Sequence, residues 1–155
     1  MTILAEMLAA GAISAPLTVA NRKALFAHFG AVAEREYGLD AHDVVDRLTE
    51  RERLGSTGFG NGIAIPHGKV AGLARVVGMF ARIAVPIDFQ AIDDLPVDLA
   101  FCLLSPPDAG ADHLKALALV SRWLRDPAFV AKLRGAASDD AVYAIFDTAS
   151  SPQPA

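Results

Sequence analysis

The stretch VDLAFCLL, residues 97–104, decides how this sequence is expected to fold. Apart from Asp98 it is apolar throughout, whereas a strand with one solvated face alternates apolar and polar residues. A continuous apolar run of this length is typical of a strand covered on both faces. We therefore expect residues 97–104 to lie within a sheet that carries helices on both sides.

The sequence on either side alternates between strand and helix signals. Further strands are expected at 63–66, at 75–85 and, as a short element, near 12–19. Helices are predicted over 22–37, 41–54, 113–125, 127–135 and up to about 146. Their predicted N-caps are Asn21, Asp40, Asp112, Asp126 and Ser138. The pattern predicts one α/β domain over residues 1–147, followed by a disordered tail, TASSPQPA, at 148–155.

The composition of the chain excludes some classes of partner and some cellular compartments. The chain has 155 residues and a net charge of −4, which argues against nucleic acid as the main partner. It contains no apolar run near the roughly 18 residues of a membrane span, and its first 14 residues lack the Lys or Arg of a signal peptide. The single cysteine, Cys102, lies in the apolar run and is expected to be a buried, inert thiol. A cytoplasmic protein without membrane insertion is therefore expected.

Several familiar site motifs can be excluded. GFGNGI, residues 58–63, departs from a dinucleotide-binding fingerprint because Ile63 stands at the third glycine position and the loop precedes a strand. The spacing from Gly55 to Gly60 fits a phosphate-binding loop, but Asn61 stands where lysine is required. The four histidines do not cluster with cysteine, so neither a metal nor another cofactor is predicted.

Two histidines remain as candidates for chemistry. His67 follows Pro66 and the apolar run 63–65, at the end of a strand and after a glycine-rich loop at 55–62 that we expect to be irregular. His113 lies at the start of a predicted helix, where the helix dipole favours an anion. Each alone is more often structural than catalytic. Together they suggest a site that handles an anion such as phosphate, with a neutral imidazole as nucleophile.

Two separated stretches carry a family resemblance. RERLGSTGFGNGIAIPHGK (51–69) and AIDDLPVDLAFCLLSPPDAGADHLKALALVSRWLRD (91–126) resemble the fructose/mannitol-type enzyme IIA domains of the bacterial phosphoenolpyruvate-dependent phosphotransferase system. The match covers residues 3–147 and looks most like the nitrogen-regulatory branch, enzyme IIA-Ntr. It implies a mixed sheet of about five strands between helices.

The resemblance also assigns roles to residues. His67 corresponds to the histidine that accepts a phosphoryl group, and His113 to a second histidine that contacts this group. Arg51, sixteen residues before His67, corresponds to the family arginine, whose planar guanidinium suits a phosphoryl group. Arg53 is the rival candidate. It lies about 200° around the helix from Arg51, so both arginines cannot face the same site.

Three loop residues have two open interpretations each. Ser56 and Thr57 are either hydroxyl donors to the phosphoryl group or ordinary turn residues. Phe59 is either an aromatic contact for a partner protein or an anchor that packs into the core.

The resemblance leaves three functional hypotheses. The first is a regulatory phosphocarrier that receives phosphate from an HPr-like protein, NPr, and acts on partners such as potassium-transport proteins or sensor kinases. The second is a sugar-specific enzyme IIA that passes the phosphate to a IIB domain. The third is an interaction module that is never phosphorylated. A homodimer is left open.

Overall fold

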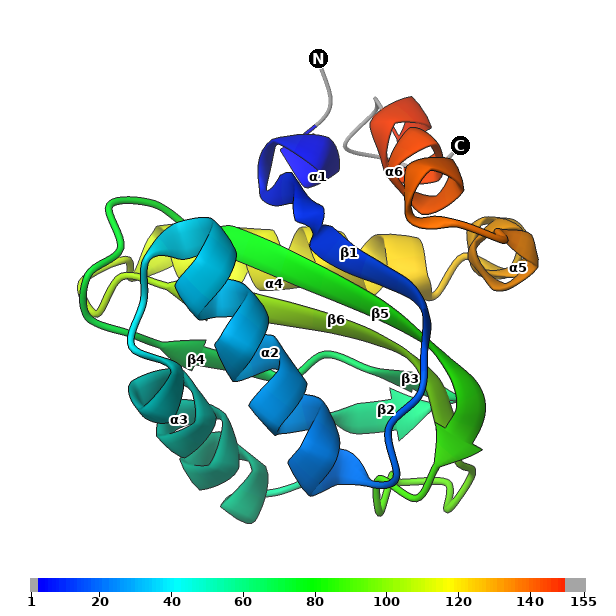
Figure 1. Ribbon diagram of the computed structural model, residues 1–155, viewed down its shortest axis with the longest axis horizontal. Coiled ribbons are helices and arrows are strands. Elements are labelled where there is room, and N and C mark those ends of the chain that lie inside the picture. Colours follow the sequence, from blue (N-terminus) through cyan, green and yellow to red (C-terminus); the bar gives the residue numbers. More distant parts are fainter. Residues whose placement is uncertain (1–2, 150–155) are drawn as a thin grey trace.

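Strand β6 (Val97–Ser105) lies in the middle of a mixed sheet, as its sequence predicts. In the computed structural model, which describes residues 3–149, the sheet order is β1-β5-β6-β3-β2, and β4 also pairs with β6 (Figure 1). The other strands are β1 (Leu8–Leu17), β2 (Gly58–Gly60), β3 (Ile63–Ala64), β4 (His67–Lys69) and β5 (Val77–Ile87). β5 runs antiparallel to β6, whereas β3 and β4 run parallel to its other side. Six strands form instead of about five because β3 and β4 follow each other along this one side.

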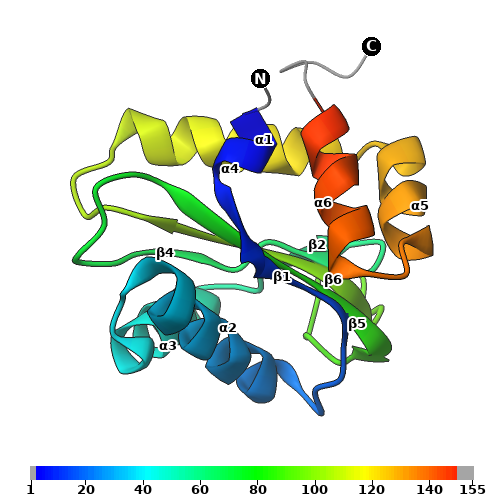
Figure 2. The same ribbon diagram turned by 45° about the horizontal axis from the view of Figure 1, so that its top comes forward.

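Helices cover both faces of the sheet, which confirms the predicted α/β fold. One face carries α2 (Arg22–Tyr37) and α3 (Ala41–Arg53). The opposite face carries α1 (Ile3–Glu6), α4 (Ala111–Leu124), α5 (Pro127–Gly135) and α6 (Asp139–Thr148) (Figure 2). The short α1 was not predicted. Within residues 3–149, no helix has both the length and the apolar character needed to cross a membrane.

Alternate residues of β6 enter two separate cores. Ala100, Cys102 and Leu104 pack with α2 and α3, whereas Leu99, Phe101 and Leu103 pack with the helices of the other face. All six are fully buried. The prediction that Cys102 is buried is confirmed, and burial raises the pKa of its thiol far above the ordinary range.

Most predicted helix ends are confirmed, with one exception. The side chains of Asn21, Asp40, Asp126 and Ser138 accept hydrogen bonds from backbone N–H groups of the helices that follow them. Asp112 was wrongly predicted as an N-cap. Gly110 holds that position with a φ of 52°, and helix α4 begins at Ala111. The left-handed backbone of Gly110, which only glycine adopts readily, fixes the start of the helix.

The glycine-rich segment 55–62 is more regular than predicted. Its second half forms β2, which pairs antiparallel with β3. Asn61 and Gly62 connect the two strands, both with positive φ (58° and 81°), as in the tight turn that Asn-Gly favours between hairpin strands. The predicted strand 63–66 is accordingly shorter and ends at Ala64. The high glycine content suggested an irregular loop, although the Asn-Gly pair signals a hairpin.

The predicted boundaries at the C-terminal side need one adjustment. Thr148 still belongs to α6, and Ala149 is buried against the core on the α4 side of the sheet. The rest of the predicted tail, residues 150–155, lies outside the described part of the chain.

Candidate functional site

His67 begins strand β4, directly after the break that Pro66 makes between β3 and β4. Its register partner in β6 is Leu103, whose N–H donates to the Pro66 carbonyl at 2.9 Å. The His67 Nδ1 lies 2.8 Å from the Ile65 carbonyl oxygen. Because a carbonyl only accepts hydrogen bonds, Nδ1 must carry the proton of a neutral ring, and Nε2 then keeps its lone pair. The backbone thus selects Nε2 as the nucleophilic atom.

Arg51 donates a hydrogen bond to this lone pair. Its Nε donates to His67 Nε2 at 3.2 Å, and its Nη1 donates to the Gly55 carbonyl at 2.9 Å. Strand β4 packs closely against α3 here: a Cβ at Gly68 would lie only 3.2 Å from the Cβ of Arg47, one helical turn before Arg51. Arg53 is exposed and lines a different cavity. Of the two arginines, the structure brings Arg51 to His67.

His113 completes the group from the third position of α4. The centroids of its ring and the His67 ring are 5.7 Å apart, with 49° between the ring planes. His113 is only 8% exposed, and its Nδ1 lies 2.6 Å from the Ser105 hydroxyl oxygen. Three predicted site residues, distant in sequence, therefore converge. Ser105 was not predicted as part of the site, because a serine at the end of an apolar strand carries no distinctive signal.

The surroundings of both histidines favour the neutral form of the ring. Burial is the main cause that lowers the pKa of His67, with a further lowering by Arg51, against raising contributions from the Ile65 carbonyl and Glu52. Burial also lowers the pKa of His113, assisted by His67 and Lys69. A neutral His67 keeps the lone pair that a nucleophile needs.

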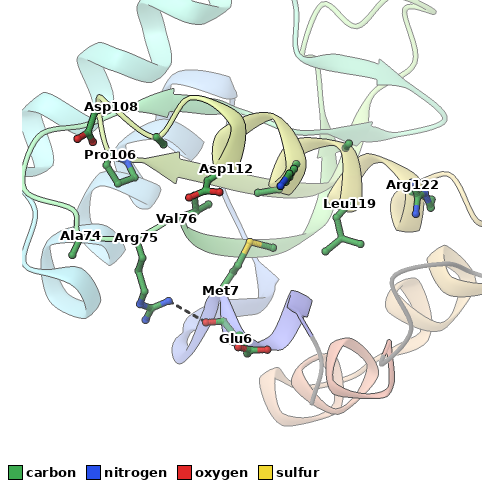
Figure 3. A pocket seen from close by; sticks show the side chains of 14 residues that line it. Glu6, Met7, Ala74, Arg75, Val76, Pro106, Asp108, Asp112, Leu119 and Arg122 are labelled. Atoms are coloured by element: carbon green, nitrogen blue, oxygen red, sulfur yellow. Dashed lines mark hydrogen bonds between the residues drawn. The ribbon is translucent and has the colours of Figure 1, made fainter.

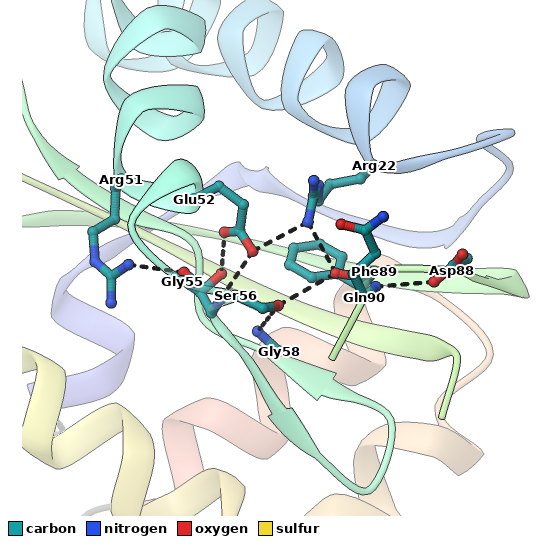
Figure 4. A network of polar contacts seen from close by, with 10 residues as sticks. Arg22, Arg51, Glu52, Gly55, Ser56, Gly58, Asp88, Phe89 and Gln90 are labelled. Carbon is teal, nitrogen blue, oxygen red and sulfur yellow. Dashed lines mark hydrogen bonds and ion pairs between the residues drawn. The ribbon is translucent and has the colours of Figure 1, made fainter. Parts of the chain in front are cut away.

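The hydroxyls of Ser56 and Thr57 are directed elsewhere. Thr57 donates from its backbone N–H and its hydroxyl to the Glu52 carboxylate, at 2.9 and 2.7 Å. The Ser56 hydroxyl lies 3.3 Å from the Phe89 carbonyl oxygen, to which it donates, and it accepts from the Gly58 N–H (Figure 4). These contacts fit the interpretation as turn residues, so the structure does not bring the two hydroxyls to His67.

Glu52 is the buried centre of this polar network. Its side chain is 3% exposed, and its carboxylate also accepts from Arg22 at 3.4 Å (Figure 4). It thereby ties the segment after α3, which includes Gly55, to α2. Glu52 could not be predicted as a buried acceptor from the sequence, because a glutamate between two arginines in RER is typical of a solvated helix face.

We expect Glu52→Gln to lower the free energy of unfolding by about 2 kcal/mol, since hydrogen bonds to a buried charged group contribute about 1.5–3 kcal/mol. For a chain of this size that corresponds to a loss of about 4–8 °C in Tm by calorimetry. Glu50→Gln is the matched control: Glu50 is more than half exposed and pairs with Arg47. Equal losses in the two variants would contradict a central role for Glu52.

Phe59 combines features of both interpretations proposed for it. It is partly buried and packs against the core on the α4 side of the sheet. The guanidinium carbon of Arg125 lies 5.0 Å from the centre of its ring, within the range of a cation–π contact. The ring is therefore anchored within the fold, and part of it still faces solvent.

One cavity is separate from the histidine site. It measures about 970 Å³ and lies beside α4, where Met7, Arg75, Asp112 and Leu119 are among its lining residues (Figure 3). Neither His67, His113 nor Arg51 lines it. The histidine site is instead formed at the surface by β4, the end of α3 and the start of α4.

A neutral imidazole with a ring lone pair, placed against a guanidinium and a second imidazole, is suited to accept a group that carries negative charge. Comparison with known proteins identifies the family of the chain. The sequence profile of the family described as "Phosphoenolpyruvate-dependent sugar phosphotransferase system, EIIA 2" matches residues 6–149. The chain belongs to this family, and the resemblance inferred from its two motifs is confirmed.

Within the family the chain is similar to nitrogen regulatory proteins. It is 43% identical to the "Nitrogen regulatory protein" of Bradyrhizobium diazoefficiens over 142 residues, which cover 92% of this chain and 93% of that protein. It is 44% identical to the Escherichia coli (strain K12) protein of the same name over 126 residues, 80% of this chain and 77% of that one. The crystal structure of nitrogen regulatory protein IIA-Ntr from Neisseria meningitidis superimposes with a TM-score of 0.87 at 37% identity, covering 94% and 99% of the two chains.

Proposed function

We propose that the protein is a cytoplasmic regulatory phosphocarrier that accepts a phosphoryl group on Nε2 of His67. The observation that carries this proposal is the contact of Arg51 Nε with His67 Nε2 at 3.2 Å, beside the ring of His113. A phosphoryl group bonded to Nε2 would take the place of this contact. The Arg51 guanidinium would then lie next to its oxygens.

The proposed donor is the phosphohistidine of an HPr-like protein, NPr. The bond between phosphorus and the donor's ring nitrogen breaks, and its electron pair returns to that nitrogen. A bond forms between phosphorus and the lone pair of His67 Nε2, while the proton stays on Nδ1, hydrogen-bonded to the Ile65 carbonyl. No proton has to move, so the contribution of the site is to position the reactants and to stabilise charge on the phosphoryl oxygens. Arg51 and His113 supply that stabilisation.

The experiment that tests this function is phosphorylation with purified components. Incubation with phosphoenolpyruvate, enzyme I-Ntr and NPr should place one acid-labile phosphoryl group on the protein. Nitrogen-15 NMR of the product should show phosphorus bonded to Nε2 of His67. If the fully folded protein remains unlabelled, or if the phosphoryl group is on Nδ1, this proposal fails.

We further propose that phosphorylation is itself the signal. It adds a charge of about −1.5 to −2 at a site whose histidines are neutral. A partner that buries apolar surface over His67 would then be repelled, whereas a partner that presents an arginine would be attracted. Candidate partners are potassium-transport proteins and sensor kinases of the nitrogen branch. The second candidate function, relay of phosphate to a sugar transporter's IIB domain, is favoured by the words "sugar phosphotransferase system" in the family description.

These two roles predict different measurements. A regulatory protein should bind its partner with an affinity that changes on phosphorylation by about 1–3 kcal/mol, or about 5- to 150-fold. Calorimetric titration of candidate partners with both forms of the protein measures this change. A relay protein should instead lose its phosphate rapidly to a purified IIB protein. Fast loss to IIB, together with partner affinities that phosphorylation leaves unchanged, would replace the regulatory proposal with sugar transport.

Phe59 is proposed as a contact for NPr, because its partly exposed ring lies in the hairpin that precedes His67. We expect Phe59→Ala to raise the Kd for NPr by about tenfold, as when a moderate interface contact is removed. Surface plasmon resonance measures the Kd, and calorimetry should show a fall in Tm of only a few degrees. A large fall in Tm with an unchanged Kd would assign Phe59 to the core alone.

A further inference from the structure

Ser105 is the last residue of β6 and lies next to His113 of the histidine site. It is fully buried, and its carbonyl accepts from the Val70 N–H at 2.8 Å, which fixes the end of β6 to the residue after β4. Leu103, two residues earlier, is the register partner of His67. Because strand side chains alternate, Ser105 and Leu103 point to the same face of the sheet, the face that α4 covers. The Ser105 side chain therefore points toward α4, where its hydroxyl contacts His113.

The direction of the hydrogen bond between Ser105 and His113 follows from the partners available. The two atoms, Oγ and Nδ1, are 2.6 Å apart. Within residues 3–149, the Ser105 hydroxyl has no other hydrogen-bond partner. If Nδ1–H donated to Oγ, the buried hydroxyl hydrogen would be left without an acceptor, which is unfavourable. The hydroxyl therefore donates to Nδ1, and the proton of the neutral His113 ring is on Nε2.

We propose that Ser105 is a positioning residue, which holds His113 in the tautomer that donates from Nε2 to an oxygen of the transferring phosphoryl group. This inference rests on the proposed function. His67 is held in the opposite tautomer by the Ile65 carbonyl, with its lone pair on Nε2. The two rings therefore offer the phosphoryl group one lone pair, for phosphorus, and one N–H, for an oxygen.

The tautomer matters because burial keeps His113 neutral. An imidazolium carries a proton on both nitrogens, but a neutral ring has only one. In the other tautomer, the lone pair of Nε2 would be available to the negatively charged phosphoryl oxygens, and lone pair and anion repel each other. Ser105 thus acts through His113 without touching the phosphoryl group.

Nitrogen-15 NMR of the unphosphorylated wild-type protein tests the tautomer directly. The His113 ring should show a protonated Nε2 and an unprotonated Nδ1. A protonated Nδ1 would overturn the proposal. This measurement requires no phosphoryl transfer, so it remains decisive even if the proposed function fails.

Kinetics test the consequence for transfer. Ser105→Ala should slow transfer from phosphorylated NPr by about tenfold, by analogy with the lower end of the losses seen when the hydrogen-bond partner that orients a metal-binding histidine is removed. Ser105→Thr, which keeps the hydroxyl, should transfer at close to the wild-type rate. Ser14→Ala is the matched control, because it removes another serine–histidine hydrogen bond, to His28 Nε2 at 2.9 Å, on the opposite side of the sheet. An unchanged rate in Ser105→Ala would overturn the proposal.

The double variant separates positioning from a general effect on the fold. If Ser105 acts through His113, then Ser105→Ala should cause no further loss in a His113→Ala background. An equal tenfold loss in both backgrounds would show that Ser105 acts by another route, and would overturn the proposal. If wild type itself is not phosphorylated, the proposed function has failed, and the tautomer measurement alone decides the role of Ser105.

Discussion

His67→Ala is expected to abolish phosphorylation from phosphoenolpyruvate, enzyme I-Ntr and NPr. In the proposed mechanism the lone pair on Nε2 is the nucleophile, and no neighbouring group replaces it: the His113 Nδ1 is hydrogen-bonded to Ser105, and the Arg51 guanidinium is always protonated. Acid-labile phosphate, measured by transfer of radioactive label, should fall to background. His42→Ala is the matched control, because His42 is exposed at the start of α3, and it should be labelled as wild type is.

The same residue carries a prediction about pH. Burial lowers the pKa of His67, so its ring should remain neutral as the pH falls through 6.5 and should take up a second proton only at lower pH. An NMR titration of the His67 ring should therefore have its midpoint below 6.5. Labelling that persists in His67→Ala, or a midpoint above 6.5 in wild type, would contradict the assignment of His67 as a neutral nucleophile.

Arg51→Ala is expected to slow phosphoryl transfer by about 30- to 1,000-fold, because loss of one donor that stabilises developing charge typically costs about 2–4 kcal/mol. Arg51 bridges His67 Nε2 and the Gly55 carbonyl, so its guanidinium is already oriented before the donor arrives. Single-turnover transfer from phosphorylated NPr measures the effect. Arg51→Lys should recover only part of the rate, since an ammonium group lacks the planar pair of donors.

Arg53→Ala is the control for this prediction. Arg53 is exposed and makes no contact with His67 among the contacts of the described residues, so transfer should be close to wild type. Calorimetry should show that both variants remain folded. If Arg53→Ala were the slow variant and Arg51→Ala transferred normally, the assignment of the phosphoryl-binding arginine would be reversed.

The sequence predicted those features of the fold that local signals determine. The caps Asn21 and Asp40 act on backbone groups within three residues, so the helix starts could be located from short patterns. The apolar run at 97–104 indicates by itself that the strand is buried on both faces. Gly110 was missed, because its effect depends on a positive φ that the sequence does not display, and Asp112 nearby gave a competing signal.

The site was only partly predictable for a different reason. Arg51, His67 and His113 were found through family motifs, since no local pattern indicates that α3, β4 and α4 meet. Contacts between distant segments decided the rest. The burial of Glu52 and the contact of Ser105 with His113 depend on how the sheet and the helices pack together. The sequence alone does not show this packing. The same contacts explain why the Thr57 hydroxyl faces Glu52.

The single cysteine makes the protein its own reporter of unfolding. Cys102 is fully buried in β6, between β5 on one side and β3 and β4 on the other. A thiol reagent can reach it only when the centre of the sheet opens, so the rate of modification follows the rarest opening events of the chain. No engineered label is needed to compare these rates between the free and phosphorylated forms, or among the variants discussed above. The modification rate of Cys102 would thus show whether phosphorylation of His67 makes opening of the central strands rarer or more frequent.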